Sequence, residues 1–279
     1  KTKSFLNEDG SITQMVASEP IHYMSADGTW EDIDLNIQAY PEGWGVTENT
    51  FTTYFAPEVA GGVMVQANEF VDPVVSGINP MLVTLDATGS APEPFITAPS
   101  PNSVDVGGNV IRYPLAEGFD LDYEVESNQV KQNLILREVP VIPEAAEYFG
   151  ISEGIRMPAG YALFSGETML GEEIFKTQED LQIRNIETGE LLVEIPAPVI
   201  LEANAAEPYT GTFFVQVHGP DIILITVVES DWLLDEDRQY PVVIDPSIRV
   251  NSASGGYCYI YYANCCLLYT SDAADEGFC

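Results

Sequence analysis

Three carboxylates alternate with apolar residues in the segment Phe119–Val125, and their spacing suits a metal ion. Alternate residues of a β-strand point to the same face, so Asp120, Asp122 and Glu124 would project together. Calcium prefers several oxygen ligands, which makes these three side chains a calcium candidate. The competing interpretation is a solvated strand face, because no loop carries the Asp-x-Asp-x-Asp-Gly spacing with its distant Glu. No other metal and no cofactor is expected.

The three tryptophans, together with Tyr40 and Tyr54, are the second group that could bind a ligand, as a platform on which sugars stack. Trp44 stands between Gly43 and Gly45, which give it little cover, so we expect this ring to be exposed. An exposed ring can stack on a sugar, and Trp44 is therefore a glycan-binding candidate. Large aromatic side chains normally fill cores. The sequence around Trp30 and Trp232 favours that role for both.

Residues for nucleophilic or phosphoryl-transfer chemistry are scarce. Two histidines, His22 and His218, are too few for a multi-histidine metal site. We expect His22 to lie in a strand, outward-facing or hydrogen-bonded, and His218 to precede a turn. No Gly-x-Ser-x-Gly elbow, P-loop or dinucleotide fingerprint is present. Two converging carboxylates would suffice for a glycosidase, but the sequence does not single out a pair, and we expect no enzyme.

Acidic residues dominate the charge. The 279 residues include 44 Asp and Glu against 10 Lys and Arg, which gives a formal net charge of −34. Such a surface repels phosphate backbones and anionic lipid, so we expect no nucleic-acid partner. The acids are interpreted as solvated faces of a secreted or salt-adapted protein. No stretch of 18 apolar residues is present, so no membrane insertion is expected.

The cysteines gather at the end of the chain, in a segment that needs separate treatment. The sequence CLLYTSDAADE, Cys266–Glu276, resembles the conceptual translation of a transposase adapter used in sequencing libraries. We therefore expect residues 266–279 to be a sequencing-adapter artefact in a metagenomic fragment; the alternative is a genuine acidic tail. If the artefact is removed, a zinc or disulfide site built on four cysteines is lost with it.

Turn signals recur between runs of β-branched and aromatic residues, which predicts an all-β fold of antiparallel hairpins and meanders. Asp9-Gly10 and Asp27-Gly28 predict tight turns in two N-terminal hairpins. Residues Pro140–Gly160 are the only expected helical interruption. The fold is expected to contain two packed β-sandwich subdomains, 1–140 and 141–250. Residues 251–265 would begin a further β-rich segment.

Four segments of the chain carry a resemblance to a known family. They are Glu19–Asp34, Ile111–Glu138, Leu191–Ala205 and Asp231–Ile248. The most specific is the last, with Trp-Leu, then Arg, then Tyr-Pro-Val-Val-Ile-Asp-Pro. Through these segments the chain is similar to the β-rich region upstream of DNRLRE-type and RHS-repeat segments in bacterial secreted and wall-associated proteins. The DNRLRE signature itself is absent from this sequence.

The resemblance implies an extracellular location at the bacterial cell surface and carries no catalytic residues. It implies a non-catalytic architectural or adhesive module of a large surface or secreted RHS-like protein. The expected partners are other domains of the same long chain and cell-wall glycan. The alternative is a carbohydrate- or calcium-binding lectin-like β-sandwich.

Overall fold

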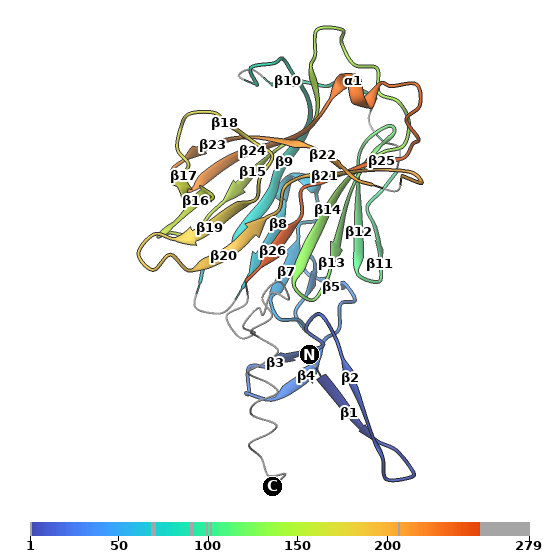
Figure 1. The fold of residues 1–279 in the computed structure, drawn as a ribbon, viewed down its shortest axis with the longest axis vertical. Coiled ribbons are helices and arrows are strands. Elements are labelled where there is room, and N and C mark those ends of the chain that lie inside the picture. Colours follow the sequence, from blue (N-terminus) through green and yellow to red (C-terminus); the bar gives the residue numbers. More distant parts are fainter. Residues whose placement is uncertain are drawn as a thin grey trace.

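The computed structural model shows two large β-sheets, with two small hairpins set apart at one end of the molecule (Figure 1). The structure describes residues 2–67, 71–89, 92–98, 100, 102–205 and 207–251. Within these ranges, helix is confined to the 3-10 turn η1 (Val59–Gly61) and the short α1 (Ser230–Leu233). The predicted all-β fold class is confirmed. The predicted adapter artefact at 266–279 and the predicted segment 251–265, apart from Asn251, lie outside the described residues.

The first sheet contains ten of the described strands, all antiparallel. Its centre is the long strand β9, which pairs with β8 on one side and with β15 on the other. In spatial order the strands are β18 (Phe175–Thr177), β23 (Thr212–His218), β24 (Asp221–Glu229), β15 (Tyr148–Arg156), β9 (Val74–Leu85), β8 (Val63–Gln66), β7 (Thr52–Phe55), β6 (Gly43–Val46) and β5 (Gln38–Tyr40), with β10 (Glu93–Pro94) beside β9.

The second sheet contains twelve of the described strands. Its centre is β14, which pairs with β13 and, on its other side, with both β25 and β26. In spatial order the strands are β11 (Asp105–Gly107), β12 (Val110–Ala116), β13 (Phe119–Val125), β14 (Gln129–Leu136), β26 (Ile248–Val250), β20 (Leu191–Ile195), β19 (Leu181–Asn185), β16 (Tyr161–Ser165) and β17 (Thr168–Met169); β25 (Val242–Asp245), β21 (Val199–Glu202) and β22 (Tyr209–Thr210) extend beside β14.

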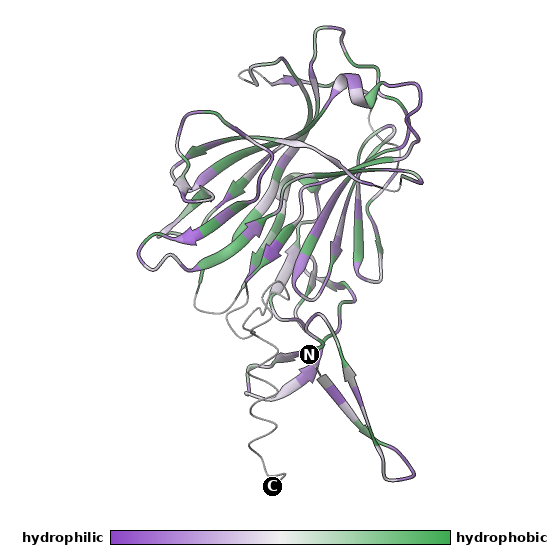
Figure 2. Cartoon of the chain, in the orientation of Figure 1, coloured by the Kyte–Doolittle hydropathy of each residue, from purple (hydrophilic) through white to green (hydrophobic). Residues whose placement is uncertain are grey.

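The main hydrophobic core lies between the two sheets. Phe149 of the ten-stranded sheet packs against Phe119 of the twelve-stranded sheet, with ring centroids 5.8 Å apart. Phe55 and Tyr123 make a second such contact at 5.9 Å. Each strand alternates its side chains between the two faces, so every second residue reaches this core. Figure 2 shows much of the hydrophobic sequence on the strands of the two sheets.

The two N-terminal hairpins follow the predicted turns. β1 (Thr2–Leu6) pairs with β2 (Ile12–Val16), and β3 (His22–Met24) pairs with β4 (Trp30–Asp32). Gly10 and Gly28 follow the predicted aspartates, and both have φ near +80° (83° and 82°), a backbone conformation that favours glycine. An ion pair joins the hairpins, because Lys3 Nζ lies 2.7 Å from Asp32 Oδ2.

Two predictions about chain organisation are wrong. Residues Pro140–Gly160 do not form a helical interruption: they contain β15, a central strand that pairs along its length with β9 and β24. The sheets are also not divided at residue 140, because strands from both halves of the sequence pair within each of them. Prolines before β15 made this segment resemble a break, although its Phe149-x-Ile151 alternation is that of a strand.

Candidate functional site

The predicted calcium face lies on β13, where arginines from the two neighbouring strands bind two of its carboxylates. Arg112 of β12 donates from Nε to Asp122 Oδ1 at 2.7 Å and from Nη2 to Asp122 Oδ2 at 2.6 Å. Arg137, directly after β14, donates from Nε to Asp120 Oδ2 at 2.8 Å. Both carboxylates are therefore held by charge-assisted hydrogen bonds.

The face expected to be in water is buried at these two positions. Asp120 and Asp122 are 2% and 6% exposed, because the arginine side chains lie over them. The apolar side of the predicted alternation is confirmed, with Phe119, Leu121 and Tyr123 in the core. No group of three or more His, Cys, Asp or Glu that could hold a metal ion occurs in the described part of the chain. Calcium binding by this face stays a prediction.

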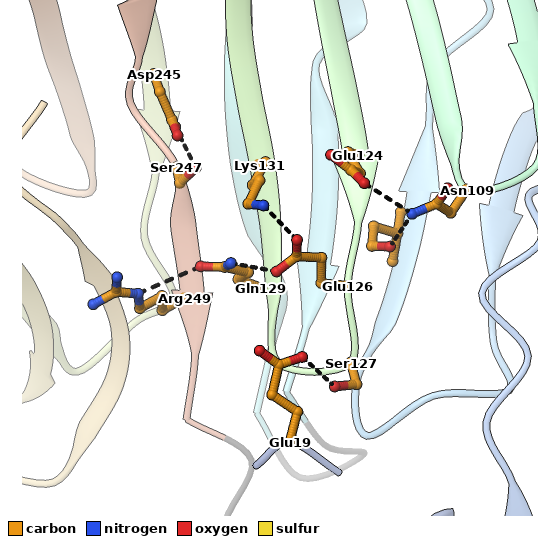
Figure 3. A network of polar contacts seen from close by, with 11 residues as sticks. Glu19, Asn109, Glu124, Glu126, Ser127, Gln129, Lys131, Asp245, Ser247 and Arg249 are labelled. Carbon is orange, nitrogen blue, oxygen red and sulfur yellow. Dashed lines mark hydrogen bonds and ion pairs between the residues drawn. The ribbon is translucent and has the colours of Figure 1, made fainter. Parts of the chain in front are cut away.

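A polar network continues toward the other end of these strands (Figure 3). Glu124 accepts a hydrogen bond from Asn109 Nδ2 at 3.3 Å. Glu126 pairs with Lys131 Nζ at 2.5 Å and also accepts a hydrogen bond from Gln129. The network thus joins the loop before β14 to β14 itself.

Arg249 of β26 extends the network to a third strand. It donates to Gln129 Oε1 and, from Nη1, to Glu194 Oε2, each at 3.4 Å. These residues line an open pocket of about 450 Å³. Ser127, at the turn before β14, donates to Glu19 at 3.4 Å, and Glu19 lines the same pocket.

The electrostatics of the network favour charged pairs. Burial disfavours the charged form of Glu126, but hydrogen bonds from Lys131 and Gln129 outweigh burial, so the pKa of Glu126 is lowered. The Glu126 carboxylate in turn raises the pKa of Lys131. Burial raises the pKa of Asp245, although Ser247 donates a hydrogen bond to it.

This sheet face is not a basic surface. Four of the chain's cations lie on it, Arg112, Lys131, Arg137 and Arg249, and each is paired with a carboxylate. Six carboxylates accompany them, so acids outnumber bases. The six are Asp120, Asp122, Glu124, Glu126, Glu194 and Asp245.

Replacing Arg137 tests the value of these pairs. Arg137→Met should lower the free energy of unfolding by roughly 2 kcal/mol, because the Asp120 side chain, which is 4% exposed, loses its charged partner. Water can replace that partner only in part, through the space that the arginine leaves. Urea unfolding at pH 7 measures the change. Arg156→Met is the matched control: its pair with Asp221 is 62% and 51% exposed, so we expect no measurable change. Equal losses in both variants would contradict the assignment.

The structure reverses the expected exposure of two tryptophans. Trp44 pairs with Phe55 across β6 and β7, and it is half-buried against the main core. Trp30 is 62% exposed on the hairpin β3–β4 rather than buried. Trp232 packs against the core as predicted and stacks on Tyr209 at 4.7 Å. Trp44 faces the core because successive residues of a strand face opposite sides of the sheet. Its two glycine neighbours therefore lie on the other face and do not expose the ring. Glycan binding by Trp44 stays a prediction.

The two histidines lie on different sheets, His22 on the hairpin β3–β4 and His218 on the ten-stranded sheet. His22 lies in a strand as predicted, with Nε2 3.0 Å from Asp32 Oδ1. His218 ends β23 at the predicted turn and is exposed. Neither lies in the network described above.

A buried polar group between the sheets was missed by sequence reasoning. Glu153 of β15 accepts a 2.5 Å hydrogen bond from Gln132 Nε2 of β14, which belongs to the opposite sheet. Burial raises the pKa of Glu153 to about 7. Beside it, the Tyr123 hydroxyl has no hydrogen-bond partner within the described residues. Gly77 has φ +64°, and a Cβ there would lie 2.3 Å from that hydroxyl, so glycine is required.

The comparisons with known proteins point away from an adhesive module. No protein-family model matches the chain. Over 275 residues, 94% of the chain, it is 23% identical to the tRNA(Glu)-specific nuclease WapA of Bacillus subtilis subsp. natto. Over the same share it is 22% identical to the tRNA nuclease WapA of Bacillus subtilis strain 168 and to the tRNA3(Ser)-specific nuclease WapA of Bacillus spizizenii. The chain is similar to tRNA nucleases over most of its length. It spans 10% of the length of each of these relatives.

These similarities overturn three predictions. The predicted non-catalytic architectural or adhesive function, with its lectin-like alternative, is contradicted by relatives named as nucleases. The same relatives contradict two further expectations, that the chain is no enzyme and that nucleic acid is excluded as a partner. The net charge describes this chain alone, whereas the names of the relatives describe proteins of which the chain spans 10%. The DNRLRE and RHS context and the cell-surface location stay predictions.

No described helix is long and apolar enough to cross a membrane.

Proposed function

We propose that this chain is the folded β body of a longer tRNA nuclease. The observation that carries the proposal is its alignment over 94% of its length with three proteins named as tRNA nucleases. Because it spans 10% of each relative, the cleavage activity would belong to the whole polypeptide. The similarity runs through both sheets, which supports the same β body in those proteins.

We further propose a division of labour within that polypeptide. Binding of tRNA draws on Lys and Arg that neutralise phosphates. On the twelve-stranded sheet the four cations described above are engaged by carboxylates. The net charge of −34 would keep tRNA away from this body and leave it to a more basic region of the same protein. The β body would thus not compete with the nuclease region for substrate.

The test uses the complete polypeptide that contains this chain. Incubated with purified tRNA, it should cleave the tRNA, whereas duplex DNA of similar length should stay intact. The 279-residue chain alone, at the same concentration, should leave tRNA uncut. The reactions are run with magnesium and with chelator and are analysed on denaturing gels.

Two outcomes separate the parts of the proposal. If the complete polypeptide leaves tRNA intact under both conditions, the proposed nuclease function is wrong. If the chain alone cleaves tRNA, the nuclease function stands, but the division of labour is wrong.

A further inference from the structure

An open pocket of about 540 Å³ lies at the β5 end of the ten-stranded sheet. Its walls include the rings of Tyr40 and Tyr54, which meet edge to face with centroids 5.5 Å apart and an interplanar angle of 78°. Tyr40 pairs with Gly43, and Tyr54 pairs with Gly45, so both rings lie on the face opposite the core. Met64, which pairs with Tyr54, lies on the same face and also lines the pocket.

Gly43, which lines the pocket, and the nearby Gly45 both lie close to the neighbouring strand β7. A Cβ on Gly43, whose φ is +141°, would lie 2.1 Å from the carbonyl oxygen of Phe55. A Cβ on Gly45 would lie 2.7 Å from the carbonyl oxygen of Thr53 and 2.9 Å from the Tyr54 ring. No other residue fits at these positions without movement of the backbone or the ring. Close packing of β6 on β7 therefore fixes the backbone beside the pocket.

We propose that this pocket binds a positively charged side chain, arginine or lysine, of a basic polypeptide. Aromatic faces attract cations, and a ring of this pair can offer its face to the ligand. Glu42 belongs to the lining and supplies a carboxylate, and none of the described residues of the lining is Lys or Arg. The chain's net charge of −34 draws a cationic partner toward it at longer range.

The lining fits a cation better than a sugar. Sugar recognition uses several polar groups that converge on hydroxyls. The described lining offers two phenols, one carboxylate and the indole of Trp44, which is half-buried against the main core. One of these phenols, Tyr40 Oη, already lies 3.3 Å from Thr47 Oγ1. The thioether of Met64 can pack along the hydrocarbon arm of arginine or lysine. The inference is independent of the proposed nuclease function.

The test compares two peptides of equal length on the intact chain. One carries three arginines separated by glycines, and the other carries citrulline, the uncharged isostere, at the same positions. Calorimetry or NMR titration should show binding of the arginine peptide, with Kd on the order of millimolar or tighter, and at least tenfold weaker binding of the citrulline peptide. Tyr40→Ala should weaken binding by about two- to fivefold, the range for one exposed cation–π contact. Tyr40→Phe, which keeps the ring, should bind as the parent does.

A second pair of variants distinguishes attraction by the pocket carboxylate from attraction by the acidic surface as a whole. Glu42→Gln should weaken binding of the arginine peptide, whereas Glu173→Gln, which alters an exposed acid outside the pocket, should not. Equal losses would mean diffuse attraction to the acidic surface and would overturn the proposal. So would equal binding of the citrulline peptide, or binding of chitotriose with none of the arginine peptide.

Discussion

Glu153→Gln should raise the free energy of unfolding by about 3 kcal/mol at pH 8. The carboxyl has a pKa of about 7 in the folded chain, against 4.5 as its ordinary value, because it is fully buried. A shift of about 2.5 units corresponds to about 3 kcal/mol, since each unit is worth about 1.4 kcal/mol. Glutamine stays uncharged and can still accept the hydrogen bond from Gln132.

The pH dependence of the parent chain follows from the same group. Below pH 4.5 the carboxyl is protonated in both the folded and the unfolded chain, so it adds no pH dependence. Between pH 4.5 and 7 the folded chain holds the proton more tightly, and stability therefore falls as the pH rises. Above pH 7 the full penalty is present. Asp245, whose pKa is also raised by burial, acts in the same direction.

The measurement is urea unfolding of both chains between pH 4 and 8 at constant ionic strength. The difference between Glu153→Gln and the parent isolates this carboxyl, because repulsion among the other acids is common to both chains. We expect the difference to grow from near zero at pH 4 to its full size at pH 8. A difference that does not change with pH would show that Glu153 is ionised, or solvated, throughout.

Phe149→Ala should lower the free energy of unfolding by about 3–5 kcal/mol, the usual cost of a deleted core aromatic. Phe149 is 0% exposed and joins the two sheets. Its ring meets Phe95 edge to face at 5.0 Å and Phe119 at 5.8 Å, so the variant loses both contacts and leaves a cavity. Phe149→Leu, which fills more of the space, should lose less.

The control for this prediction is an apolar residue of similar type at the surface. Ile96 is 88% exposed, so Ile96→Ala should change stability by less than about 0.5 kcal/mol. Urea unfolding of the three variants at pH 6 gives the comparison. A loss below about 1 kcal/mol for Phe149→Ala would mean that the sheets do not depend on this contact.

Local patterns in the sequence were enough to place many of the strands. Phe119–Val125 is a strand with the predicted bounds, and Asp9-Gly10 and Asp27-Gly28 lie at the predicted hairpin turns, because alternation and turn residues act over a few neighbours. Pairing between distant strands leaves no such local signal. The sequence therefore did not predict that β15 lies between β9 and β24, nor that strands from both halves share each sheet.

The candidate sites show the same limit. Spacing placed Asp120 and Asp122 on one face, but only the fold shows that arginines from β12 and from the end of β14 cover them. Glu153 did carry a local signal, since it stands in register with Ile151 and Ile155, both of which face the core. An acid in the inward register of a strand indicates a buried carboxyl. The helical interpretation of Pro140–Gly160 hid that signal.

The position of β26 has a consequence for how the chain reaches its native state. This strand lies between β14 and β20, and its Arg249 pairs with Gln129, 120 residues earlier in the sequence. Contacts between such distant residues slow folding, because a long loop must close before they form. Until residue 250 has left the ribosome, β14 and β20 lack this shared neighbour and present unpaired edges to other chains. During this time the strong negative charge makes neighbouring chains repel one another. This repulsion keeps the unpaired edges of one chain from pairing with those of another.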